Sequence, residues 1–154
     1  MMKATDSHTT THGALGAFAF GIGATEMASV WTLGRILNVE VPGTIRVNVN
    51  GRPREGVYPK DVILHLIGRL TAAGANDKAL EFHGEAIRVM PTSGRLVLCN
   101  MSVEAGATAA VVPPDDETRR YLNEVAGVWK NFDTFAPDEG AVYEQVIEID
   151  ASAL

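Results

Sequence analysis

Two imidazoles and a carboxylate lie close together near the start of the sequence, in the stretch DSHTTTHGALGAFAFGIG at residues 6–23. His8 and His12 are four residues apart, so a helix would place both rings on one face, as two ligands of one metal ion require. The hydroxyl residues between them favour a loop instead. In that case Asp6 and Ser7 would accept hydrogen bonds from the free amides of the following helix, a structural role that the spacing alone favours.

A second candidate group is the stretch CNMSVEAGA at residues 99–107. Glu104 lies among small and apolar residues, where a carboxylate is costly unless it is paired or hydrogen-bonded. An exposed glutamate at a helix end is the simpler interpretation. Cys99 is the single cysteine of the chain, and one thiol cannot hold a zinc ion or an iron–sulfur cluster. We therefore expect Cys99 to be a small buried residue.

The elements that must position these groups begin with an apolar, glycine-containing segment. Residues 14–35 predict a helix in two pieces, interrupted at Gly21 and Gly23, with Thr25 as the cap of the second piece. Residues 44–51 alternate apolar and polar side chains and predict a half-buried strand. The proline at position 59 and the apolar spacing after it predict a helix over 59–73.

The second half of the sequence alternates short strands with helices. The expected strands are 78–84 and 108–114, and the expected helices are 84–90, 93–103 and one that Asp115 or Asp116 caps and that ends near 126. Residues 141–150 fit a strand, although 141–148 also fit a helix. The alternation predicts one layered α/β domain over residues 1–154, without repeats or a linker.

Composition and charge narrow the possible partners. The net charge is −6, with +1 on residues 1–114 and −7 on residues 115–154. This acidic end argues against a nucleic-acid partner, which needs a clustered basic face. The longest apolar run is too short to span a membrane, and the sequence shows no signal-peptide pattern. A single cysteine fits a reducing compartment. We expect a cytoplasmic protein without nucleic-acid or membrane partners.

Long motifs occur in a specific order along the chain: DSHTTTHGALGAFAFGIGATE, PKDVILHLIG, EFHGEAI and LCNMSVEAGA. Together they closely resemble the aconitase superfamily, in the branch that contains the large subunits of 3-isopropylmalate dehydratase, homoaconitase and dimethylmalate dehydratase. The resemblance covers essentially the whole chain. It implies a layered α/β/α domain of the aconitase iron–sulfur type. It also implies a hydro-lyase that removes and re-adds water on a hydroxy di- or tricarboxylic acid.

The resemblance also implies roles for particular residues. In the family the DSH segment and the glutamate of the CNM segment line the active site, which here gives Asp6, Ser7, His8 and Glu104 as catalytic candidates. His8 and Glu104 are expected to pair, the carboxylate holding an imidazole that helps to protonate the departing hydroxyl. Asn100 is expected to lie against the cofactor.

The implied cofactor is a [4Fe–4S] cluster, and the implied partners are further large-subunit segments and a small swivelling subunit. The family's three cluster cysteines lie further toward the C-terminus and are not in this sequence, and Cys99 matches a family cysteine that is not a ligand. We therefore expect no metal ligands among these residues and an inactive isolated chain. The alternative is a stand-alone domain without turnover that acts as an interaction module. The start MMKAT is expected to replace the strand that normally leads into the DSH motif.

Overall fold

The computed structural model describes residues 1–36, 39–127 and 135–154. Its N-terminal part is a two-stranded parallel sheet of β1 (Met2–Ala4) and β2 (Ala19–Gly21). The 3-10 helix η1 (Ser7–Leu15) connects the two strands, and helix α1 (Ala24–Leu33) follows β2. The strand that leads into the DSH motif is therefore present, contrary to the expectation for MMKAT.

The prediction that the first piece of the segment 14–35, before Gly21, is helical is wrong. The chain leaves η1 at Gly16, which has a φ of 82°, a left-handed conformation that favours glycine and ends helices. The apolar residues after it then form β2 beside β1. The second piece is confirmed as α1, but its cap is Gly23 rather than Thr25, because the Glu26 carboxylate accepts the Gly23 amide.

The larger body is a four-stranded parallel sheet in the order β5-β4-β3-β6. Its strands are β3 (Gly43–Asn50), β4 (Lys78–His83), β5 (Ala109–Val111) and β6 (Gln145–Asp150). The connecting helices are α2 (Pro59–Leu70), α3 (Glu85–Arg88), α4 (Thr92–Met101), η2 (Ser102–Ala105) and α5 (Asp116–Glu124), and η3 (Ala151–Ala153) follows β6. The predicted α/β class is confirmed.

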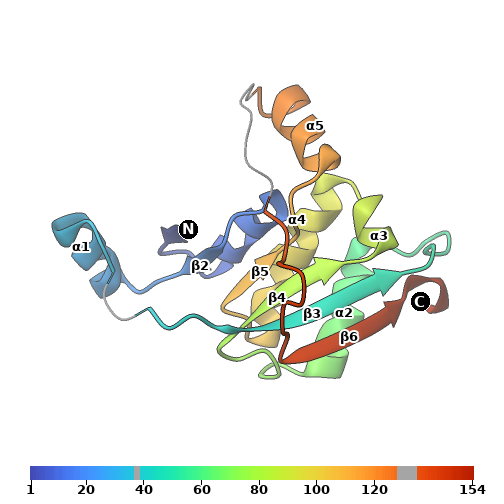
Figure 1. The fold of residues 1–154 in the computed structure, drawn as a ribbon, viewed down its shortest axis with the longest axis horizontal. Helices are drawn as coiled ribbons and strands as arrows, with labels where there is room; N and C mark the ends of the chain where they lie inside the picture. Colours follow the sequence, from blue (N-terminus) through green and yellow to red (C-terminus); the bar gives the residue numbers. More distant parts are fainter. Residues whose placement is uncertain (37–38, 128–134) are drawn as a thin grey trace.

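The layers follow from the path of the chain. Helices α2 and α4 pack together behind the sheet, and the segment that leads into β6 crosses its front face (Figure 1). That segment contacts β3 at two points. The Glu144 amide donates to the Thr44 carbonyl, and Arg46 stacks on the ring of Tyr143. The end of the chain is a strand because Ile147 and Ile149 alternate into the core, which excludes the helical alternative for 141–148.

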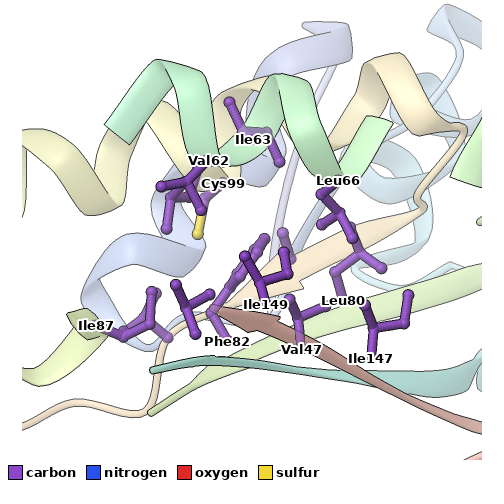
Figure 2. Close-up of a cluster of buried hydrophobic side chains, with 14 of the residues drawn as sticks. Val47, Val62, Ile63, Leu66, Leu80, Phe82, Ile87, Cys99, Ile147 and Ile149 are labelled. Atoms are coloured by element: carbon purple, nitrogen blue, oxygen red, sulfur yellow. The ribbon is translucent and has the colours of Figure 1, made fainter. Parts of the chain in front are cut away.

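The core lies between the sheet and helices α2 and α4 (Figure 2). Val47 and Phe82 point from adjacent strands toward Leu66 of α2, and all three are buried. Cys99 of α4 points into the same cluster and has no exposed surface, which confirms its predicted role. Within the described ranges, no helix has the length and apolar character needed to cross a bilayer.

A buried arginine joins α4 to α5. Arg95 has no exposed surface, and its guanidinium donates to both carboxylate oxygens of Asp115 at 2.7 Å and to the carbonyls of Arg88 and Met90 at 3.1 Å. Asp115, one of the two residues predicted as the cap of this helix, also caps α5 by accepting the amides of the residues two and three positions later. This one carboxylate thus satisfies a buried charge and a helix end at the same time.

Candidate functional site

The DSH motif forms the first turn of η1. Asp6 is its N-cap: the Asp6 carboxylate accepts the His8 amide at 2.6 Å, and the Asp6 carbonyl accepts the Thr9 hydroxyl at 2.6 Å. The expected loop over these residues is therefore a 3-10 helix, with an irregular backbone at His8. Capping by the motif, which the spacing favoured, is therefore present. Asp6 makes the capping hydrogen bonds, so the side chains of Ser7 and His8 are not used to cap the helix.

His8 lies between a hydroxyl and a carboxylate. Its Nε2 is 3.5 Å from Oε1 of Glu104, and its Nδ1 is 3.1 Å from the Ser7 hydroxyl. The two side chains of the His8–Glu104 pair keep 42% and 57% of their surface exposed, so a ligand can reach them. His8 and Glu104, which are far apart in the sequence, are therefore brought within ion-pair distance.

Helix α4 and η2 carry the other half of this site. Both pack against η1, and η2 ends at Gly106, whose φ of 85° again needs a glycine. Asn100 on α4 donates its side-chain amide to the Thr11 hydroxyl at 2.9 Å. The sequence analysis did not single out Thr11, although its place in the hydroxyl run between the two histidines was a visible signal.

A cavity of about 590 Å³ adjoins the motif. Asp6 and Ser7 line it, whereas His8, Asn100 and Glu104 do not. Much of its apolar wall comes from β2 with its flanking residues and from the chain beyond α1, and these residues were not predicted as part of a site: Phe18, Phe20, Ile22, Ile36 and Val39. Asp6 and Ser7 thus line the cavity, His8 joins Ser7 to Glu104, and Asn100 contacts Thr11 on the same helix η1.

The two histidines do not converge on a common point. The His12 Nδ1 is 3.0 Å from the Thr9 carbonyl, whereas His8 faces Ser7 and Glu104. Across residues 1–36, 39–127 and 135–154, no three side chains of the types His, Cys, Asp and Glu are grouped to hold a metal ion. The spacing of His8 and His12 therefore does not produce a shared metal site.

The donor set does not fit an iron–sulfur cluster. Such clusters are held by several cysteine thiolates, and Cys99 is the only cysteine in the chain. Its thiol is packed in the hydrophobic core, where burial raises its pKa far above the ordinary value and so disfavours the thiolate, with a smaller opposing influence of Arg95. These 154 residues do not supply the ligands of a cluster.

Thr9 and Thr10 are neighbours in η1, and both are at most 2% exposed. Thr9 Oγ1 donates to the Asp6 carbonyl, whereas Thr10 Oγ1 has no hydrogen-bond partner among the described residues. Because an unpaired buried hydroxyl is unfavourable, Thr10→Val should raise the free energy of unfolding by about 1 kcal/mol. The matched variant Thr9→Val should lower it by about 1 kcal/mol. Urea unfolding measures both, and equal effects would contradict the assignment.

Comparison with known families assigns the sequence to one family. The family model described as "Aconitase family (aconitate hydratase)" matches residues 1–154. The chain belongs to the aconitase family. This membership confirms the resemblance carried by the DSH, EFHG and CNM motifs.

Curated members of the aconitase family share much of this sequence. The chain is 48% identical over 149 residues to the 3-isopropylmalate dehydratase large subunit 1 of Methanopyrus kandleri, and 52% identical over 149 residues to the large subunit of Elusimicrobium minutum. These alignments cover 97% of this chain and 35% of each relative. The large subunit 1 of Thermotoga maritima is 46% identical over 154 residues, which is all of this chain and 36% of that protein. The chain thus spans about a third of the length of these relatives.

Proposed function

We propose that this chain forms one wall of the active-site pocket of a hydro-lyase that dehydrates and rehydrates a hydroxy di- or tricarboxylic acid of the 3-isopropylmalate type. The observation that supports it most is the contact between His8 and Glu104 at 3.5 Å. Relatives named 3-isopropylmalate dehydratase, at 48% and 52% identity, supply the reaction class.

The reaction needs a proton for the departing hydroxyl group. In the proposal His8 donates it, because an imidazole can give and take protons near neutral pH. Glu104, on the far side of the ring from Ser7, acts as a positioning residue that holds the imidazole. Asp6 fixes the turn on which both Ser7 and His8 lie.

Other parts of the complete enzyme would supply the cofactor. The [4Fe–4S] cluster that the family implies would be bound by cysteines outside this sequence, and Asn100 at the rim of the site would lie toward it. Further large-subunit segments and a small subunit would complete the pocket. The stand-alone interaction domain without turnover is the competing possibility.

A chimera tests the catalytic role directly. The 149 residues of the Elusimicrobium minutum large subunit that match this chain would be replaced by this chain, and the product assembled with that organism's small subunit and loaded with iron and sulfide. We expect dehydration of 3-isopropylmalate or of a related hydroxy acid. The absorbance of the unsaturated product measures this reaction. A loaded chimera without turnover on any of these acids would reject the proposal in favour of the interaction domain. The isolated 154-residue chain, treated identically, should show neither a stoichiometric cluster nor turnover.

A further inference from the structure

Two polar contacts join η1 to the helices that carry Asn100 and Glu104. The first is the contact of His8 with Glu104 at 3.5 Å. The second is the contact of Thr11 with Asn100 at 2.9 Å. Thr11 follows His8 by three residues in η1, which is one turn of a 3-10 helix. Glu104 follows Asn100 by four residues across the junction of α4 and η2, which is about one helical turn. The second contact therefore lies one turn away from the pair that supports the proposed function.

The Thr11 hydroxyl has a fixed direction. Its Oγ1 donates to the His8 carbonyl oxygen at 2.6 Å. A hydroxyl carries one hydrogen, so Thr11 can only accept a hydrogen bond from a second partner. The Asn100 side chain must then present its amino group, and Nδ2 donates to Thr11 Oγ1. The carboxamide oxygen of Asn100 is consequently turned away from Thr11.

The preceding threonine Thr9 shows what is particular to Thr11. Thr9 Oγ1 donates to the Asp6 carbonyl, three residues earlier, at 2.6 Å. This bond matches the corresponding bond of Thr11 in spacing and in length. Within the described ranges, the Thr9 hydroxyl contacts no polar group of another element. Bonds from a threonine hydroxyl to a carbonyl three or four residues earlier are common in helices, so the contact with Asn100 is what distinguishes Thr11.

The Thr11–Asn100 contact is partly shielded from solvent. Both residues are half-buried, whereas the side chains of His8 and Glu104 keep 42% and 57% of their surface exposed. A half-buried amide that loses its acceptor is unfavourable. Without the Thr11 hydroxyl, the Asn100 side chain would therefore turn to regain hydrogen bonds elsewhere.

We propose that Thr11 is a positioning residue for the proposed reaction, which sets the direction of the Asn100 side-chain amide relative to His8. The inference rests on the proposed function, which gives His8 its role and places Asn100 at the rim of the site. One hydroxyl group serves both residues, because it donates to the His8 carbonyl and accepts from the Asn100 amide. A displacement of about 1 Å in such a group is enough to lower a rate about a hundredfold.

Three variants of the loaded chimera test this role. Thr11→Val keeps the shape of the side chain without the hydroxyl, and should lower kcat about 10–100-fold with less than about a threefold change in KM. Thr11→Ser keeps the hydroxyl and should retain at least about half of the wild-type kcat. The matched control Thr9→Val removes a bond of the same kind without the contact to Asn100, and should change kcat less than about threefold. Wild-type kcat in Thr11→Val, or an equal loss in Thr9→Val, would overturn the inference.

A double variant identifies the route by which Thr11 acts. Asn100→Ala removes the group that Thr11 is inferred to orient. Adding Thr11→Val to Asn100→Ala should lower kcat by less than about a further twofold, because two residues that act as a unit are not additive. Losses that multiply would assign the effect of Thr11 to the fold of η1 and would refute its action through Asn100.

A spectroscopic measurement on the full chain does not depend on turnover. In an isotope-labelled sample, the resonances of the Asn100 side-chain amide are those that Asn100→Ala removes. We expect Thr11→Val to speed the exchange of this amide with water about fivefold or more, and Thr11→Ser less than about twofold. Thr9→Val should also leave the exchange rate within about twofold. An unchanged exchange rate in Thr11→Val would remove the hydrogen bond on which the inference depends.

The outcome is distinguishable from that of the proposed function. A loaded wild-type chimera without turnover rejects the proposed function, and the role of Thr11 in catalysis is rejected with it. An active wild-type chimera whose kcat survives Thr11→Val overturns the positioning role alone and leaves the proposed function in place.

Discussion

Asp115→Ala is expected to lower the free energy of unfolding by about 3–5 kcal/mol, as measured by urea denaturation. Arg95 has no exposed surface and uses the Asp115 carboxylate as its only acid partner among the described residues. Removing the carboxylate leaves a buried positive charge that two carbonyls alone must satisfy. The same change deletes the N-cap of α5, so the two losses act together.

Two further variants separate the buried charge from surface electrostatics. Arg120→Ala breaks ion pairs that the 47% exposed Arg120 makes with Glu117 and Glu124, and should cost less than about 1 kcal/mol. The double variant Arg95→Met with Asp115→Ala removes both buried charges and should recover part of the loss. A single Asp115→Ala variant within about 1 kcal/mol of the wild type would show that Arg95 is satisfied without its partner.

The same pair makes part of the stability depend on pH. Burial raises the pKa of Asp115, but hydrogen bonds from Arg95 and from the amides of Thr118 and Glu117 outweigh it, and the pKa is lowered overall. A carboxyl whose pKa is lower in the folded state stabilises the fold above its ordinary pKa, and this contribution is lost as the pH falls through the lowered value. The wild type should therefore lose more stability on acidification than Asp115→Ala does.

The larger sheet was predictable because its signals are local. Apolar residues alternate along β3, and the apolar residues of α2 recur at helical spacing after a proline, so neighbouring residues alone determine both elements. The GAFAFG segment was mispredicted because a short apolar run fits a buried helix as well as a buried strand. Pairing with β1, a contact outside the window, decided the outcome.

The candidate site was harder to predict from the sequence than the larger sheet. Spacing indicated a cap at Asp6 and one at Asp115 or Asp116, since a cap acts on amides two or three residues away, and the structure selects Asp115. Nothing local joins His8 to Glu104, and that pair was expected only because of the family resemblance. The burial of Arg95 was not foreseen either, because arginine is seldom fully buried and its partner lies twenty residues further along the chain.

Glu104→Gln in the loaded chimera is expected to lower kcat by about 10²–10⁴-fold, with a much smaller change in KM. The amide keeps the size of the side chain but cannot carry the negative charge that faces His8 at 3.5 Å. Glu104→Asp retains the charge at a shorter reach and should keep more activity than Glu104→Gln. The matched control is Glu124→Gln, an exposed glutamate on α5, which should leave kcat unchanged.

A double-mutant cycle distinguishes positioning from a general structural effect. If Glu104 acts through His8, then His8→Asn alone should cost about as much as the double variant, because two groups that work as a unit are not additive. Independent structural roles would instead multiply the two losses. Equal cluster content and equal melting temperature across the four proteins would assign the loss of kcat to the chemistry. A Glu104→Gln chimera that retains wild-type kcat would remove Glu104 from the mechanism and leave His8 to act without it.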